Sequence, residues 1–155
     1  MTQQVDLLKV EFIRTASLPT GTLRCDSATG TLNIAVGLDR STQATLTISD
    51  VTFDLVDKGY LSNIEILWPR ERWKIRAELE QPQAVGTAIA RFPNVLGHLV
   101  QDKDIEVLGS PDKRTLVVHF HTGRESASYR IASQVVMSVS QGGILTSLWI
   151  EGIEC

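Results

Sequence analysis

The chain has 155 residues with a formal net charge of −3, and its 43% hydrophobic and 21% charged residues are the composition of one ordinary globular domain. Its apolar runs are only a few residues long, whereas a membrane-spanning helix needs roughly 20, so no membrane protein is predicted. The acidic balance disfavours nucleic-acid binding, which normally depends on clustered Lys and Arg side chains.

The first half of the chain has the two-residue period of β-strands. Leu8, Val10 and Phe12 alternate with other residues near the start and predict a first strand. Lys58 and Gly59 follow a later strand, at a place where a tight hairpin needs the positive φ that glycine adopts without a Cβ clash. The same alternation predicts strands at 22–24, 31–38, 44–49, 51–56 and 60–67.

The connecting segment 69–105 is less regular. Apolar residues from Trp73 to Leu79 alternate with charged ones and predict a strand, and 87–92 predicts another. The residues 94–101 follow Pro93 and predict one short helix, although Gly97 lowers its helix propensity by about 1 kcal/mol relative to alanine.

The second half of the chain repeats the first. Thr31 aligns with Thr115, a shift of 84 positions, and the two segments then run together without a gap up to Leu67 and Glu151. The glycine turn recurs at Gly143. A repeat of this kind organises a fold, because each unit can bury its apolar face against the other. Identical pairs are Thr31/Thr115, Leu32/Leu116, Arg40/Arg124, Ser49/Ser133, Val51/Val135, Gly59/Gly143, Leu61/Leu145 and Ile66/Ile150.

These patterns predict a mainly β fold. Two similar antiparallel β-meander units, at about 22–68 and 106–152, are expected to pack face to face as a sandwich with pseudo-twofold symmetry. The chain is then a single domain over 1–155, with the short helix of the connecting segment between the units.

The two cysteines stand far apart, at Cys25 and at the last position, Cys155. This spacing is not that of a disulfide framework and predicts two free thiols in a reducing cytoplasm. The start of the chain lacks a basic region followed by an apolar one, so no secretory signal is expected.

The hairpin of the first unit resembles a known family. The run Asp57-Lys-Gly-Tyr-Leu-Ser-Asn-Ile-Glu-Ile-Leu67 is similar to the typical D-x-x-G-x-hydrophobic-x-G-I-E-I-L run of DUF2283, a family of small bacterial domains of unknown function. The second copy departs from that run, with Gln141 in place of the aspartate, and Asn63 and Ser147 replace the usual glycine. Such domains are often found near toxin and defence genes, so the resemblance implies a partner-binding role and no particular activity.

A stretch between the units has the composition of an interface. Trp68, Arg70, Arg72 and Trp73 fall within six positions at a strand end, and aromatic and arginine side chains are enriched at binding hot spots. The alternative is that the tryptophans close the end of the core while the arginines are solvated.

Three carboxylates around one strand form a second candidate surface. Asp50 and Asp54 are expected on the face opposite Val51 and Phe53, with Asp57 at the following turn. This alternation is also what a sheet with one wet side produces, so a contact surface for a basic partner is favoured over catalysis.

His119 and His121 flank Phe120, and a period of two places both imidazoles on one strand face. They are weak candidates for a metal site, because zinc needs three or four ligands and no cysteine pair or nearby carboxylate has ligand spacing. No metal or cofactor is therefore predicted.

The sequence carries no nucleophile motif such as Gly-x-Ser-x-Gly and no activated cysteine, so no catalytic residue is assigned. The function predicted is a non-enzymatic protein-binding module, an immunity- or antitoxin-like inhibitor that covers the active site of a basic toxin domain, acting as a monomer or homodimer. One alternative is a small-ligand- or metal-binding domain using the cleft between the repeats, near Trp149, His119 and His121. The other is an enzyme with a site assembled from scattered polar residues.

Overall fold

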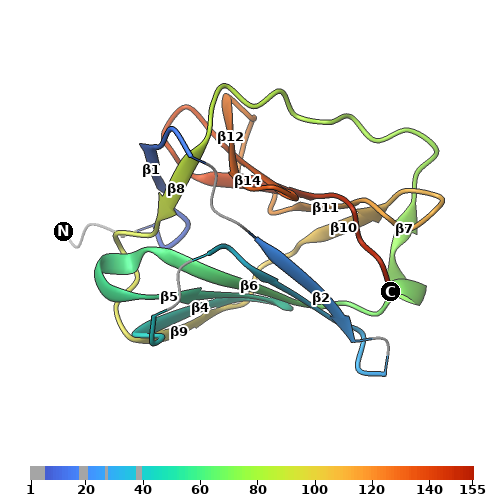
Figure 1. Ribbon diagram of the computed structural model, residues 1–155, viewed down its shortest axis with the longest axis horizontal. Coiled ribbons are helices and arrows are strands. Elements are labelled where there is room, and N and C mark those ends of the chain that lie inside the picture. The colour runs from blue at the N-terminus through green and yellow to red at the C-terminus, as the bar shows by residue number, and fades with distance from the viewer. Residues whose placement is uncertain (1–5, 18–20, 27, 38–39) are drawn as a thin grey trace.

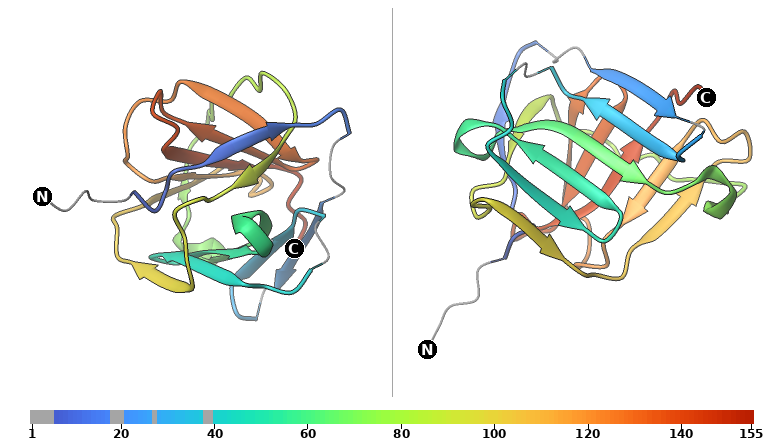
Figure 2. Two further views of the ribbon diagram at one scale, coloured as in Figure 1. Left: turned by 90° about the vertical axis from the view of Figure 1, so that its left-hand side faces the viewer. Right: turned by 90° about the horizontal axis from the view of Figure 1, so that it is seen from below.

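A computed structural model describes residues 6–17, 21–26, 28–37 and 40–155 of the chain. Two six-stranded sheets stack on each other, and a two-stranded ribbon lies across one end of the stack (Figures 1 and 2). The prediction of a mainly β, sandwich-like fold is confirmed.

The first sheet has the strand order β2-β3-β6-β5-β4-β9. Its strands are antiparallel, except that β9 runs parallel to β4 at the sheet border. The predicted strand 31–38 ends earlier, and its last residue, Leu38, lies outside the described residues. The strands are β2 (Thr22–Asp26), β3 (Thr31–Ala35), β4 (Ala44–Ile48), β5 (Val51–Leu55), β6 (Leu61–Leu67) and β9 (His98–Gln101).

The second sheet has the order β12-β13-β14-β11-β10-β7. Its border strand β7 pairs parallel to β10 over two residues, and the other pairs are antiparallel. The strands are β7 (Lys74–Ile75), β10 (Glu106–Gly109), β11 (Leu116–His119), β12 (Ala127–Ala132), β13 (Val135–Val139) and β14 (Leu145–Ile150).

The two halves of the chain form their sheets in the same way. Leu32 pairs with Ile66 as Leu116 pairs with Ile150, and the register shift after Asp54 recurs after Ser138. In each sheet the second strand of the unit pairs with the fifth, so the order is not that of a simple meander. The paired registers agree with the 84-residue shift, while a common ancestry and a pseudo-twofold axis stay predictions.

The space between the sheets is filled by apolar side chains. Phe53 of β5 is fully buried. Its ring centroid lies 4.9 Å from that of Phe92 and 6.3 Å from that of Phe120. A separate cluster of Val117, Val136 and Trp149 packs on the outer face of the second sheet. The core therefore occupies the region in which a cleft between the repeats was expected.

The ribbon joins both sheets at one end. It consists of β1 (Glu11–Arg14) and β8 (Ala88–Arg91). Lys9 bridges to Ile144 of the second unit, and Tyr60 of the first unit bridges to Arg91. The predicted strands at the start of the chain and at 87–92 are these two elements, shifted or shortened by a few residues.

Two predictions for the connecting segment are wrong. The residues 94–101 form no helix, because Gly97 has a φ of +76° and the following residues become β9 beside β4. The alternation from Trp73 to Leu79 produces only the two-residue β7, because the chain then leaves the sheet. Over the described residues the helical elements are two short 3-10 turns, at Asp57–Gly59 and Arg70–Arg72, and no helix is long and apolar enough to cross a membrane.

The prediction of free thiols is also wrong. Cys25 in β2 and Cys155 form a disulfide with their Cα atoms 5.4 Å apart. The tail after β14 brings Cys155 to β2, because Ile153 is buried in the core and its N–H donates to the carbonyl oxygen of Arg114 at 2.9 Å. The last residues thus connect the second sheet covalently to the border strand of the first.

Candidate functional site

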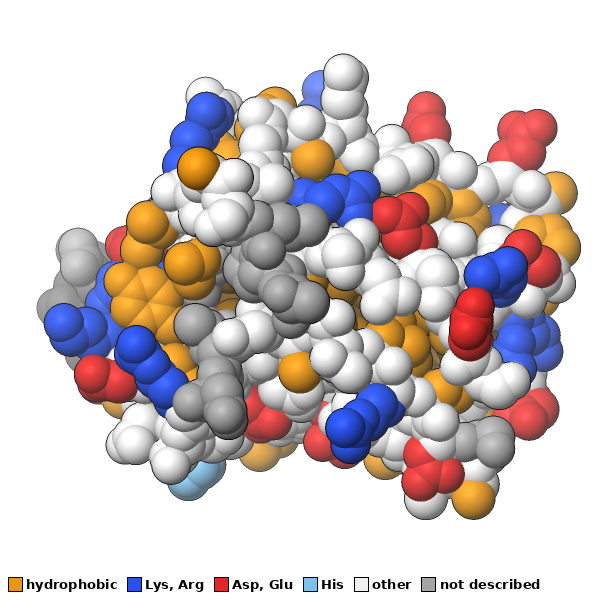
Figure 3. Space-filling model, in the orientation of Figure 1, with side chains coloured by type: hydrophobic (Ala, Val, Ile, Leu, Met, Phe, Trp, Pro, Cys, Tyr) orange, Lys and Arg blue, Asp and Glu red, His pale blue; other side chains and the backbone are white. Residues whose placement is uncertain are grey.

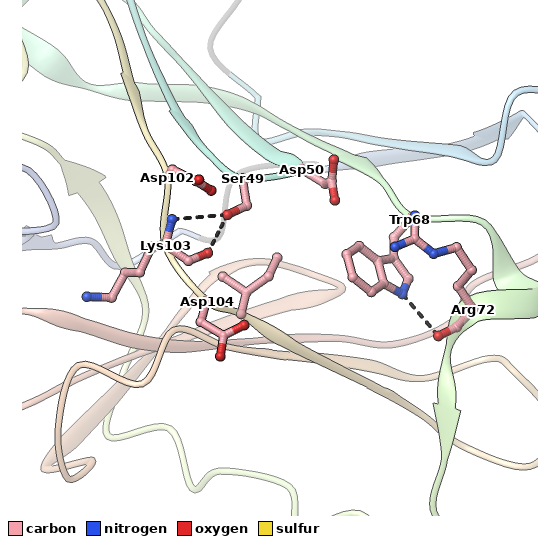
Figure 4. Close-up of a pocket in the computed structure, with 8 residues that line it drawn as sticks. Ser49, Asp50, Trp68, Arg72, Asp102, Lys103 and Asp104 are labelled. Carbon is pink, nitrogen blue, oxygen red and sulfur yellow. Dashed lines mark hydrogen bonds between the residues drawn. The ribbon is translucent and has the colours of Figure 1, made fainter.

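One cavity of the described chain lies where the backbone crosses between the sheets. One crossing follows β6 at Trp68 and continues to Arg72, and the other follows β9 at 102–105. The turn between β4 and β5, at Ser49 and Asp50, closes the third side. The cavity is open and has a volume of about 650 Å³ (Figure 4).

Ser49 ties the β4–β5 turn to the second crossing. Its hydroxyl donates to the carbonyl oxygen of Lys103 and accepts a hydrogen bond from the Lys103 N–H at 3.2 Å. Ser49 has a φ of +52°, a conformation that costs an L-residue free energy. These two hydrogen bonds hold the wall formed by Asp50 against the wall formed by Lys103.

Replacing Ser49 by alanine is expected to lower the free energy of unfolding by about 1–2 kcal/mol, because both hydrogen bonds are lost while the positive φ remains. Ser49→Gly loses the same hydrogen bonds, but glycine adopts the positive φ without steric cost. Its loss of unfolding free energy should therefore be smaller. Urea unfolding of both variants checks the order, and equal losses would contradict the role given to the backbone conformation.

Trp68 forms the aromatic wall of the cavity. Its indole N–H donates to the carbonyl oxygen of Arg72 at 3.2 Å, and the Arg72 guanidinium carbon lies 4.2 Å from the indole centroid. Trp73 is 7% exposed and donates from its own indole to the Trp68 carbonyl oxygen at 2.9 Å. Arg70 stacks on Trp73 at 5.9 Å. The ring of Trp68 is thus fixed, with its six-membered edge toward the cavity (Figure 4).

Carboxylates outnumber cations around the cavity. Asp50, Asp102 and Asp104 line it together with Arg72 and Lys103. Arg72 is stacked on the indole, and the Lys103 side chain extends away from Trp68 (Figure 4). On the face shown in Figure 3, acidic and basic side chains are interspersed.

The structure brings together only part of the predicted site. Asp50, Trp68 and Arg72 line the cavity, and Arg70 and Trp73 adjoin it through the stacking just described. Two other predicted residues lie elsewhere. Asp54 is on the outer face of the first sheet and accepts a hydrogen bond from the Asn63 amide at 3.2 Å, and Asp57 lines a second cavity with Lys58 and Arg91.

The sequence reasoning missed the wall at 102–105. Asp102, Lys103 and Asp104 fall in the connecting segment, and their position depends on β9 being a strand of the first sheet. The available signal was the Asp-Lys-Asp triplet itself, which is separated from the apolar pair Leu99-Val100 by Gln101 alone.

The two histidines do not share a strand face. β11 ends at His119, and His121 lies beyond it with a φ of +54°, which interrupts the alternation. Within the described ranges no group of three or more His, Cys, Asp or Glu side chains is arranged to hold a metal ion. Trp149, expected near the cleft, packs instead on Val117 and Val136 at the outer face.

One carboxyl group outside the cavity has a shifted pKa. The pKa of Asp112 is lowered, mainly because the Ser110 hydroxyl donates to its carboxylate and also because the Arg114 N–H does so. Asp112 is fully exposed in the β10–β11 turn, so its shift reflects turn formation.

Comparison with known protein families and with curated proteins gives no match to this chain. The resemblance to DUF2283 therefore rests on the residues of the 57–67 hairpin alone and stays a prediction. The interpretation of the site depends on its geometry and charge.

Proposed function

We propose that the protein is a non-catalytic protein-binding module whose cavity receives a basic side chain of its partner. The observation that carries this proposal is the combination of three carboxylates with a fixed indole ring around one open cavity. A Lys or Arg side chain satisfies both elements, because its charge pairs with carboxylates while its stem or guanidinium packs on an aromatic face.

The dimensions of the cavity support a side chain as the occupant. About 650 Å³ falls in the range of small-molecule pockets, but the cavity is open to solvent. An open site with carboxylates at its rim suits a residue that projects from a larger surface, since rim charges steer a partner of opposite charge. Trp68, Asp50 and Asp104 are the anchors expected to dominate such a contact.

An immunity-like inhibitor of a basic toxin domain is the most concrete form of this function. The net charge of −3 and the resemblance of the 57–67 hairpin to domains found near toxin genes support it. The disulfide suits an oxidising compartment better than the cytoplasm, so it counts against the cytoplasmic location that the sequence predicted. The alternative of a ligand or metal site between the repeats has no such support, because core side chains fill that space.

A peptide titration tests the cavity directly. The probes are acetyl-Gly-Arg-Gly-amide and its lysine counterpart, and the readout is the indole N–H resonance of Trp68 in two-dimensional NMR spectra. We expect a saturable shift that weakens with added salt and is lost in Asp50→Asn and Asp104→Asn, because exposed charge pairs are screened. Asp54→Asn is the matched control, since this carboxylate lies outside the cavity.

A neighbouring gene product tests the biological partner. Co-purification that is retained in Asp54→Asn and lost in Asp50→Asn would support the inhibitor role. The proposal would be overturned if neither peptide shifts the Trp68 resonance and the cavity variants bind the partner as well as the wild type does.

A further inference from the structure

The border strand β9 differs from the other borders of the two sheets. β2 carries Arg24, Asp26 and the disulfide, and β7 is only two residues long and carries Lys74. β12 is covered by the preceding chain, because the Val85 N–H donates to Ser128 and Arg130 donates to Gly86. Charged, short or covered borders are how proteins prevent sheets from pairing with each other.

β9 has none of these protections over the described residues. The run Leu96-Gly-His-Leu-Val-Gln101 has no acidic, lysine or arginine side chain and no proline. It pairs only with β4, and Figure 2 shows it at the outer border of its sheet. Leu96 is 82% exposed and Val100 79% exposed, more than any other large hydrophobic side chain in the described part of the chain. Exposed apolar side chains beside an unpaired strand are typical of a pairing site.

The free backbone groups of β9 can be assigned. Gly97 and Gln101 accept hydrogen bonds from Thr45 and Ser49 of the β4 side, and successive residues of a strand point their polar groups to alternate sides. His98 and Val100 therefore direct their N–H and C=O groups away from β4.

These free groups are self-complementary. We propose that a second copy of this chain pairs with β9 in antiparallel register, with Leu99 on the twofold axis. His98 of one copy then lies opposite Val100 of the other and exchanges both backbone hydrogen bonds with it, twice across the axis. The first sheets of the two copies become one continuous sheet, and the Val100 side chain of each copy lies beside that of His98 of the other copy on the outer face.

The charges flanking β9 agree with an antiparallel arrangement. Asp102, Lys103 and Asp104 follow its C-terminal end with a net negative charge. Its N-terminal end, at Leu96 and Gly97, lines the second cavity, where Lys58 and Arg91 accompany Asp57. Arg91 also pairs with Glu11 at 2.8 Å, so the charges at this end are balanced. Antiparallel pairing places the acidic end of each copy against the charge-balanced end of the other. A parallel arrangement would place like charges together.

In the proposed dimer the two binding cavities lie apart from each other. Each cavity adjoins the C-terminal end of β9, so the antiparallel arrangement places one cavity at each end of the shared border. The pairing does not involve Asp50, which lies in the β4–β5 turn outside β9. Asp50→Asn should leave dimerisation unchanged, so failure of either proposal can be distinguished from failure of the other.

Sedimentation velocity over a range of protein concentrations tests the pairing. We expect a concentration-dependent dimer that weakens at least about tenfold in Val100→Lys, because a lysine at an unpaired border blocks strand addition. Val85→Lys is the matched control, since Val85 is 55% exposed and lies away from β9. Wild-type protein that stays monomeric at about 1 mM would overturn the proposal, and so would equal effects of both variants on the dimer dissociation constant. A different protein would then be the candidate partner of β9.

A cysteine pair tests the register. Residues opposite each other on the axis, in a pair without hydrogen bonds, have Cα atoms about 4.5 Å apart, so Leu99→Cys should form an intermolecular disulfide under mild oxidation. Gln101→Cys should form none, because the two copies of this position lie on opposite sides of the axis. Efficient cross-linking of Gln101→Cys without that of Leu99→Cys would contradict the register.

Discussion

Replacing Cys25 by serine is expected to lower the free energy of unfolding by about 3–5 kcal/mol, the largest effect of any single side-chain change considered for this chain. The disulfide joins positions separated by 130 residues, and cross-links that close long loops remove the most entropy from the unfolded chain. Urea unfolding followed by tryptophan fluorescence measures the change.

Two controls separate the bond from the side chains. The double variant Cys25→Ser, Cys155→Ser should be as unstable as the single one, because either change removes the same bond. Reduced wild-type protein should match both variants. A single variant whose midpoint equals that of the oxidised wild type would show that the disulfide does not form in solution.

Gly59→Ala is expected to lower the free energy of unfolding by about 3 kcal/mol. Gly59 has a φ of +83°, and a Cβ at this position would lie 2.5 Å from the carbonyl oxygen of Phe92. The Phe92 N–H also donates to the Gly59 carbonyl oxygen at 2.8 Å, so the backbone cannot move away without breaking this bond. Phe92 is a fully buried core residue, and its displacement would be felt by Phe53.

Gly143→Ala is the matched comparison from the other half of the chain. Its φ of +79° imposes the same conformational cost, but the added Cβ would meet the Lys9 ammonium, at the end of a flexible side chain, at 2.9 Å. The nearest backbone atom, the Val10 carbonyl oxygen, is farther away, at 3.3 Å. We therefore expect a loss of about 1–2 kcal/mol, the cost of the backbone conformation. Thermal and urea unfolding measure the loss of unfolding free energy in both variants. Equal losses would mean that the backbone at Phe92 moves to accommodate the added Cβ at little cost.

Strand positions could be predicted because the alternation of apolar residues reflects the two faces of a sheet. Leu46 and Ile48 of β4 are fully buried while Thr45 and Thr47 between them are half-buried, as their spacing indicates. The strand at 98–101 could not be predicted in this way. Its assignment depends on the vacant border of β4, a feature that exists only once the first sheet has formed.

The disulfide and the cavity could not be predicted from the sequence for the same reason. Cys155 reaches Cys25 because the tail crosses from one sheet to the other, and no local pattern encodes that crossing. Asp50 meets the Trp68 segment because the Leu67 N–H donates to the Asp50 carbonyl oxygen at 2.9 Å, across two strands of one sheet. The sequence indicated the residue types suited to an interface, and the topology decides which of them meet.

The covalent link at the last residue also determines how the protein responds to mechanical force. A load applied through the C-terminus passes from Cys155 directly to Cys25, so it bypasses every strand from β3 to β14. Among the strands, β1 and the first residues of β2 lie outside the loop that the bond closes. Under reducing conditions the same load would instead pull on the tail after β14 and remove the buried Ile153 side chain from the core. The bond thus makes most of this chain a closed ring that tension cannot unravel.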